Sequence, residues 1–445
     1  MTLKRRAPIP MLACTLCTLL LAGPSRAGLY NVTDLGSLGG VQGSGAYAFS
    51  DGVAVGYSFV QVTESVHAMI NDHGTVLDLG TLGGSQSLAR AVNVWGDVVG
   101  WAYPPGLNIQ RAFLWHQGVM TDLGTFGGPI ADAHGINDAG LIVGSAFNAE
   151  EHERAFWWKD GVMHDMGSLG GTGSRALAVN AAGDISGWGS TEGDNEIHAF
   201  LSKPGSPLYD LGSLGGPASY GWDVNNAVHV CGWSLLNFVG PESRGFLWAD
   251  GIMKALGTLG GIYSSAFGLN DFDQVVGTST RADGVEAAFL WSHNQMVDLN
   301  TLLVPGADWF LASAWDIDQA GDIVGEGVRP NGDHRAFLLT PVGGAGVPPG
   351  TASAALRFAG ASPNPAREGS RFGFGLPRAG RASLVLHDLS GRAVRGLAAG
   401  WFAAGEQSVA WDGRDDRGAR LAPGAYFARL STEQGTLARR FVVVR

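Results

Sequence analysis

One short pattern recurs through most of this chain and restricts its fold more than any other feature. The segment DLGSLGG starts at Asp34 and returns with small changes at Asp78, Asp122, Asp165, Asp210, Ala255 and Asp298, at spacings of 44, 44, 43, 45, 45 and 43 residues. A unit of this length cannot bury its apolar face alone, so successive copies must pack against each other. The period is typical of a four-stranded blade of a β-propeller.

Each copy reads as four short strands joined by tight turns. In the third copy, Ile142-Val143 is a β-branched pair and Phe156-Trp157-Trp158 is an aromatic run, and both are typical of strands. Asn137 to Gly140 and Asp160-Gly161 have the composition of hairpin turns, in which glycine adopts a positive φ. The repeated unit is therefore expected to be all-β.

The two ends of the repeat region complement each other. The last copy ends at Leu339-Thr340 without a fourth strand, whereas Tyr30 to Gly36 matches such a strand and stands before the first full copy. We therefore predict a seven-bladed β-propeller over residues 28–340, with the N-terminal strand completing the last blade. Closure of this kind removes exposed sheet edges. A parallel β-solenoid is the alternative fold, although its coils usually have shorter periods.

Residues 1–27 have the features of an export signal. Lys4-Arg5-Arg6 precede the apolar stretch from Met11 to Ala22, and cleavage is expected between Ala27 and Gly28. No later segment approaches the ~18 to 20 consecutive apolar residues of a membrane-spanning helix. We therefore predict an exported protein without a transmembrane segment.

A second domain follows a linker at residues 341–355, which contains the sequence GGAGVPPG. Residues 356–445 alternate apolar and polar positions between turns, which predicts an immunoglobulin-like (Ig-like) β-sandwich. Residues 28–356 carry 11 basic and 33 acidic side chains, whereas the residues from Arg357 onward carry 14 Arg and 7 acids. The basic tail is expected to dock on the acidic repeat region or to contact anionic polysaccharide. The acidic repeat region argues against nucleic-acid binding.

Two resemblances accompany these patterns. The triplet His198-Ala199-Phe200, with its altered copies, resembles the extracellular HAF-repeat family, which implies an exported bacterial protein. In the tail, the motifs Ser362 to Pro365, Asp388 to Arg392, Trp411 to Asp415 and Pro423 to Tyr426 resemble the Ig-like domain of the flagellar hook-capping protein and the related type IX secretion sorting domain. The second resemblance implies export or anchoring through the tail.

Acidic and cationic side chains recur at fixed places in the repeat. Six units begin with Asp, six place His or Arg about 33 residues later, and the exceptions, Ala255 and Ala287, fall in one unit. We therefore predict ion pairs that clamp successive blades, such as Asp78 with Arg111. The alternative is that each Asp accepts backbone N–H groups of its own turn. The clamp candidates are Asp78, Arg111, Asp122, Arg154, Asp165, His198, Asp210, Arg244, Asp298 and Arg335.

The sequence offers no catalytic constellation. The hydroxyl that follows each Gly or Asn of the recurring turn is interpreted as a turn hydrogen bond, and there is no HExxH motif or Cys/His cluster. No cofactor is predicted. Asn270 to Asp273 resembles a calcium loop but lacks regular ligand spacing, so calcium binding is left as an alternative to a hairpin turn.

These observations predict a non-enzymatic, secreted or cell-surface repeat protein that binds an extracellular protein or polysaccharide and contacts secretion machinery through its C-terminal domain. The alternative is a glycan hydrolase or lyase on a propeller scaffold. A central pocket whose residues break the sevenfold equivalence would favour the enzyme. Binding is expected on the variable loops that contain Tyr103, Phe147, Phe238, Tyr263, Trp309 and Phe310.

Overall fold

The computed structural model describes residues 29–61, 65–342 and 356–444, apart from residues 363, 368, 377–379, 390, 403–404 and 433–434. The predicted signal peptide with its cleavage site at Ala27–Gly28, and residues 343–355 of the predicted linker, lie outside this range. The described chain is all-β, with two 3-10 turns, Glu192–Asp194 and Leu299–Leu302. No helix in this part of the chain has the length and hydropathy needed to span a bilayer.

Within the described residues, the repeat region forms seven sheets of four antiparallel strands. The first three are β2 (Gly39–Ser50), β3 (Val53–Val60), β4 (Val66–Asp72) and β5 (Thr75–Asp78); β6 (Ser87–Val92), β7 (Val98–Ala102), β8 (Arg111–His116) and β9 (Val119–Asp122); and β10 (Gly127–Ile136), β11 (Ile142–Asn148), β12 (Glu153–Lys159) and β13 (Val162–Asp165). The antiparallel pairing excludes the parallel β-solenoid.

The next three sheets are β14 (Gly170–Val179), β15 (Ile185–Thr191), β16 (Ile197–Ser202) and β17 (Tyr209–Asp210); β18 (Ser219–Val224), β19 (Val230–Leu235), β20 (Ser243–Ala249) and β21 (Ile252–Ala255); and β22 (Gly260–Leu269), β23 (Val275–Arg281), β24 (Glu286–Ser292) and β25 (Gln295–Asp298). A single parallel bridge, Ser243 with Tyr263, joins the last two of these sheets. The seventh sheet contains β26 (Phe310–Ile317), β27 (Ile323–Val328), β28 (His334–Pro341) and β1 (Tyr30–Asp34).

The N-terminal strand completes the last sheet, as the sequence predicted. β1 pairs antiparallel with β28 from Tyr30 opposite Pro341 to Asp34 opposite Phe337. The last sheet also packs on the first, because Val324 and Ala336 share one buried cluster with Ala46. The two ends of the repeat region therefore meet in space.

Successive sheets are held together by small and aromatic side chains that face each other. Val55 and Ala68 of the first sheet lie in one buried cluster with Ala89, Val98 and Phe113 of the second. The aromatic landmark of the third strand is fully buried in six copies, and a methionine takes its place in the first. These residues are Met69, Phe113, Phe156, Phe200, Phe246, Phe289 and Phe337.

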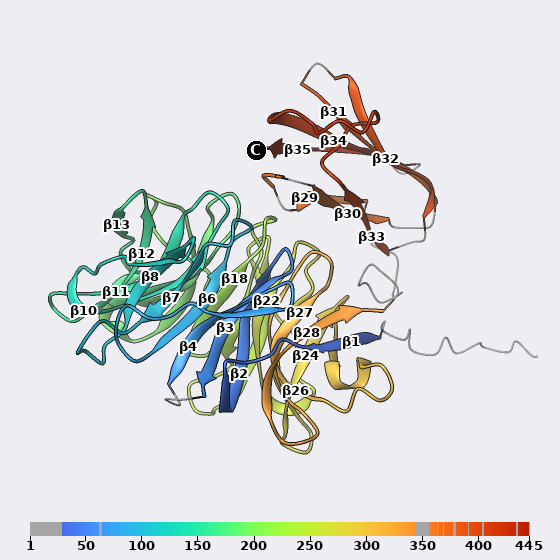
Figure 1. Ribbon diagram of the computed structural model, residues 1–445. Helices are drawn as coiled ribbons and strands as arrows, with labels where there is room; N and C mark the ends of the chain where they lie inside the picture. The colour runs from blue at the N-terminus through green and yellow to red at the C-terminus, as the bar shows by residue number, and fades with distance from the viewer. Residues whose placement is uncertain are drawn as a thin grey trace, which may run out of the picture.

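The tail forms two further sheets. One contains β29 (Arg357–Ser362), β30 (Ser370–Leu376) and β33 (Gly405–Trp411), and the other contains β31 (Gly380–His387), β32 (Ala393–Phe402), β34 (Gly424–Thr432) and β35 (Gly435–Val443). They enclose a core of their own, which includes Phe358, Phe372, Phe374, Trp411 and Phe441. Figure 1 shows these strands gathered beside the repeat region.

The tail contacts the hairpins that join the first and second strands of the repeat sheets. Arg357 lies 3.7 Å from the carboxylate of Asp273, and the guanidinium of Arg367 lies 4.4 Å from the ring centre of Trp95. These contacts agree with the docking expected from the opposite charges of the two domains.

Candidate ligand site in the central cavity

The predicted ion pairs between successive blades, such as Asp78 with Arg111 and Asp122 with Arg154, do not form; each of these residues pairs within its own sheet instead. Arg111 lies 3.2 Å from Asp122, and Arg154 lies 3.2 Å from Asp165. The reason is register: Phe113 is opposite Asp122 across the third and fourth strands, so the cation two residues before the Phe is the diagonal neighbour of the Asp. His67 with Asp78 at 2.8 Å and His198 with Asp210 at 2.9 Å follow the same rule.

The remaining candidates fit this register. Arg244 has Ala255 as its diagonal neighbour and donates to the backbone carbonyls of Ser243 and Ile262 instead. Asp298, which has Ala287 as its diagonal neighbour, lies 3.3 Å from Arg281. Ala255 and Ala287 are therefore not partners, and their occurrence in one unit was misleading.

At the two ends of the repeat region the clamp residues have other partners. Arg335 lies 3.2 Å from Asp333, and Asp34 lies 3.2 Å from Arg329.

The alternative interpretation of the repeated Asp is confirmed. Asp78 and Asp122 each accept the backbone N–H of the glycine two residues later at 2.8 Å. The neighbouring hydroxyls also belong to the turn, since Ser213 donates to the carbonyl of Gly216 at 2.7 Å. These residues are structural.

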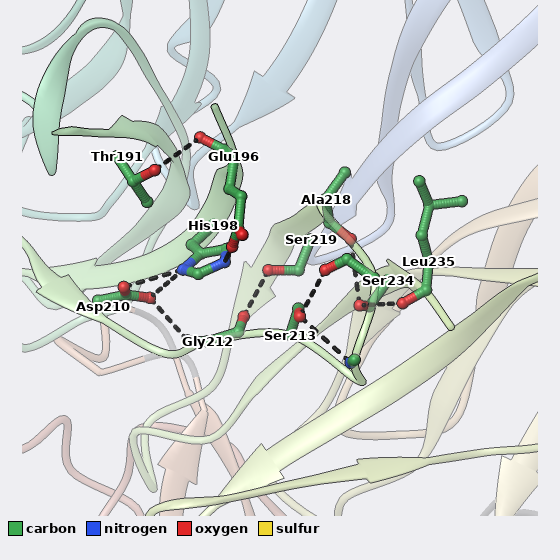
Figure 2. Close-up of polar contacts among 12 residues, drawn as sticks. Thr191, Glu196, His198, Asp210, Gly212, Ser213, Ala218, Ser219, Ser234 and Leu235 are labelled. Atoms are coloured by element: carbon green, nitrogen blue, oxygen red, sulfur yellow. Dashed lines mark hydrogen bonds and ion pairs between the residues drawn. The ribbon is translucent and has the colours of Figure 1, made fainter. Parts of the chain in front are cut away.

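The first strand of each repeat sheet (β2, β6, β10, β14, β18, β22 and β26) is called its inner strand below. In five sheets this strand carries a buried serine whose hydrogen bonds join successive sheets. Ser219 of β18 donates to the carbonyl of Gly212 at 2.6 Å and accepts the N–H of Ala199, in β16 of the preceding sheet, at 2.8 Å. Figure 2 shows the Ser219 hydroxyl directed at Gly212. Equivalent serines are Ser44, Ser87, Ser174 and Ser264.

Asparagines at the hairpin ends make a second set of contacts between sheets. The side-chain amide of Asn137 donates to the carbonyl of Asn180 at 2.9 Å, and Asn180 donates to Asn225 at 2.9 Å. The same contact runs from Asn93 to Asn137, from Asn225 to Asn270, and from Asn270 to Asp318. The Asn-x-x-Gly motif therefore shapes the hairpin and also joins one sheet to the next.

The inner strands share an irregularity that the sequence reasoning missed. In each inner strand, the register of pairing with the second strand shifts by one residue. At that point the inner strand has one more residue than the second strand, and this extra residue stands between two residues that pair normally. A β-bulge of this kind redirects a side chain. The seven bulged residues are Tyr47, Arg90, His134, Leu177, Trp222, Phe267 and Trp315.

All seven bulged residues line one cavity of about 220 Å³. One part of its wall is aromatic: Phe267 stacks on Trp315 with ring centres 4.3 Å apart, and Tyr47 meets Trp315 edge-on at 5.0 Å. The other part is polar, because Arg90 and His134 approach the buried carboxylate of Asp132 at 3.4 and 3.3 Å. Six residue types occupy seven equivalent positions, so this is where the copies differ.

Burial sets the electrostatics of the cavity. It lowers the pKa of His134 well below its usual value, and Arg90 lowers it further, so the imidazole is neutral at pH 7. Burial raises the pKa of Asp132. It also raises the pKa of Asp223 to about 6 and that of Asp316 to about 7, two carboxyls that also line the cavity.

Several polar atoms beside the cavity have no protein partner. In the described part of the chain, Arg90 Nε, Asp132 Oδ1, His134 Nε2 and Trp222 Nε1 are buried without a hydrogen bond. Buried polar atoms are usually paired, so unpaired atoms gathered at one place need an explanation.

A sequence signal for these residues exists. Each bulged residue follows Ala or Gly, precedes Ala, Gly or Asp, and stands three positions before the hairpin Asn, Ser or Asp, as in Ala89-Arg90-Ala91-Val92-Asn93. The pattern of a variable residue between small ones would have located the cavity wall.

None of the six aromatic residues expected on variable loops lines the cavity, and Phe147, Tyr263 and Phe310 lie in strands β11, β22 and β26 rather than in loops. Phe238 is 68% exposed in the loop between β19 and β20 and does not line the cavity. As for metals, the described residues hold no group of three or more His, Cys, Asp or Glu side chains that could bind an ion.

Comparison with known families identifies the tail. Residues 362–436 match the model of the FlgD Ig-like domain. The chain therefore carries a FlgD Ig-like domain. Comparison of the whole sequence with curated proteins gives no match.

Solved structures show only distant likeness. PorZ, described as an essential bacterial surface component of the type IX secretion system of Porphyromonas gingivalis, is 12% identical over a match that covers 90% of this chain and 59% of PorZ, with a TM-score of 0.41. TolB of Acinetobacter baumannii is 10% identical over a match that covers 66% of this chain and 64% of TolB, with a TM-score of 0.40. Dipeptidyl peptidase 4 of P. gingivalis is 9% identical over a match that covers 73% of this chain and 56% of the peptidase, with a TM-score of 0.35. The chain thus spans less than two thirds of each of these proteins, and likeness at this level carries no argument about function.

Proposed function

We propose that this chain is a secreted or cell-surface binding protein without catalytic activity, which recognises an extracellular protein or polysaccharide. The observation that carries the proposal is the ring of bulged residues. A copied unit keeps its packing residues alike, but at the seven positions that face the cavity it presents Tyr, Arg, His, Leu, Trp and Phe. Variation at equivalent positions of a cavity wall favours recognition over packing.

We further propose that the seven sheets are the blades of a closed seven-bladed propeller. The pairing of β1 with β28, the shared core of the last and first sheets, and the asparagine contacts between neighbouring sheets all support closure. Such a scaffold places its inner strands around one axis and leaves no sheet edge inside the ring.

The tail is proposed to deliver or anchor the protein. Its FlgD Ig-like domain resembles type IX secretion sorting domains, and the repeat triplet His198-Ala199-Phe200 resembles extracellular HAF repeats. We therefore propose a bacterial protein that contacts secretion machinery through residues 356–445 and acts outside the cell. No cofactor is proposed.

The enzyme alternative has one observation in its favour, since the central pocket does break the sevenfold equivalence. Its carboxyls, however, are engaged in the scaffold. Asp223 accepts the N–H groups of Val224 and Leu269, and Asp316 accepts those of Phe49 and Ile317. Hydrolysis of glycans generally needs two carboxyl groups that face the bond to be cleaved. Asp132 lies beside Arg90 at 3.4 Å and does not line the pocket.

Binding of the full exported chain to arrays of glycans and surface proteins, with and without EDTA, tests the proposal. We expect retention of a polymer without release of new reducing ends or unsaturated products. Turnover of a bound glycan would establish the alternative. For the tail, a chain ending at residue 350 should stay in the periplasm while protease resistance shows that its repeat region is folded; normal release would refute the sorting role.

A further inference from the structure

The central cavity combines hydrogen-bonding groups with flat apolar rings. We propose that it binds one neutral sugar residue, an inference that rests on the binding function proposed above.

The unpaired atoms of the lining residues require a ligand that accepts hydrogen bonds, because Arg90 Nε and Trp222 Nε1 are obligate donors. The unpaired acceptor Asp132 Oδ1 belongs to a carboxylate that contacts Arg90 and His134 but does not itself line the cavity. His134 Nε2 lies 3.3 Å from Asp132 Oδ2 without the alignment of a hydrogen bond. An apolar ligand would leave all of these atoms desolvated and unpaired, at a cost in affinity. Hydroxyl groups satisfy donors and acceptors alike.

The charges of the cavity favour a neutral ligand. Arg90 already faces Asp132 at 3.4 Å, and the nearby Arg175 lies 2.6 Å from Glu153. Each cation thus has a carboxylate, so an anionic ligand finds no uncompensated cation, and both oxygens of Asp223 and of Asp316 already accept backbone N–H groups. A charged ligand would also lose its hydration in this buried place.

The shape of the cavity suits a single sugar ring. Trp222, Phe267 and Trp315 come from three neighbouring sheets, pack on one another and give the cavity an aromatic wall, against which the C–H face of a pyranose can pack. A volume of about 220 Å³ corresponds to roughly seven water molecules at ~30 Å³ each. It lies below the range of ~300 to 1,000 Å³ that holds drug-sized ligands. The cavity therefore has room for one residue and not for a stretch of chain.

A polymer would have room to continue beyond that residue. A second cavity of about 940 Å³ lies between the hairpin ends and the tail, and Trp95, Arg367 and Trp411 are among its lining residues. The two cavities are adjacent along the strands, since Ala48 lines the first and Phe49 the second. The terminal residue of a glycan is thus the ligand that this arrangement fits.

Titration of the full exported chain tests the inference. The probes are glucose, galactose, mannose and N-acetylglucosamine, with galacturonate and glucosamine as charged counterparts. Binding is followed by saturation-transfer NMR and tryptophan fluorescence. At least one neutral sugar should bind more tightly than either charged one. Trp222→Phe, which keeps the ring and removes the N–H, should weaken that binding about tenfold, as expected for one lost hydrogen bond.

Two further variants guard against misfolding and non-specific effects. His134→Gln should also weaken binding. Trp157→Phe is the matched control, since Trp157 stacks on His164 at 3.7 Å and does not line the cavity, and it should bind as the parent does.

The outcomes separate the two proposals. Tighter binding of a charged sugar, or equal affinity in both cavity variants, overturns the inference. Retention of a polymer or protein on arrays without binding of any free sugar also overturns it and leaves the proposed function standing. Failure in both assays removes both.

Discussion

The carboxylate of Asp316, in the inner strand of the last sheet, accepts the backbone N–H of Phe49, in the first sheet, at 2.8 Å. The two residues are 267 positions apart in the chain. Asp223 makes the equivalent bond to Leu269 between the fifth and sixth sheets, also at 2.8 Å. In the other sheets a small residue stands at this position. Asp316 thus ties the two ends of the repeat region together beside the cavity.

This buried carboxyl should make stability depend on pH. Burial, aided by Asp223, raises the pKa of Asp316 from 3.8 to about 7, so between these values the folded chain holds a proton that the unfolded chain has released. Stability therefore falls as pH rises through this window, by at most about 4 kcal/mol for such a shift. Asp316→Asn should flatten the dependence, measured by urea unfolding from pH 4.5 to 8. An unchanged slope in the variant would contradict the assignment.

The ion pairs predict which double mutant shows coupling. Arg111→Ala and Asp122→Ala should be non-additive by about 0.2 to 1 kcal/mol, as is usual for partly exposed pairs. Asp122→Ala and Arg154→Ala should be additive, because Arg154 pairs with Asp165. Thermal or urea unfolding of both cycles measures this. Coupling between Asp122 and Arg154, with none between Arg111 and Asp122, would instead support ion pairs between successive sheets.

The hydrogen bonds of Ser219 predict a larger loss of stability than the ion pairs do, although the substitution removes only one hydroxyl group. Ser219→Ala removes one hydroxyl but leaves the carbonyl of Gly212 and the N–H of Ala199 unpaired in a buried place, which should cost about 1 to 3 kcal/mol. Ser213→Ala, in the neighbouring partly exposed turn, is the control and should cost less. Equal unfolding midpoints for the two variants would show that the hydrogen bonds of Ser219 contribute little.

Docking of the tail can be tested at a position without a side chain. A Cβ atom at Gly373 would lie 2.4 Å from the Phe272 ring of the repeat region. Gly373→Val should therefore separate the tail from the hairpin ends and raise the radius of gyration measured by small-angle scattering. At Gly400, in the same domain, a Cβ atom would meet nothing within 4 Å, so Gly400→Ala should leave the scattering unchanged. A compact Gly373→Val variant would argue against this docking.

Much of the local structure follows from the sequence alone. The recurrence of one turn and one aromatic strand predicts sheets of four strands, because each signal acts within a few residues. The missing last strand and the matching segment at Tyr30 predict where β1 pairs, since an unpaired edge is costly. The tail motifs predict its Ig-like domain in the same way.

Only the tertiary structure decided which residues meet. The partner of Asp122 is Arg111 and not Arg154, because strand register, and not spacing along the chain, places side chains side by side. Successive bulged residues are more than 40 positions apart in the sequence, from Tyr47 to Trp315, and although small flanking residues mark each position, nothing local shows that Tyr, Arg, His and Leu meet. They come together only because the packed sheets point one irregular position of each inner strand at a common cavity.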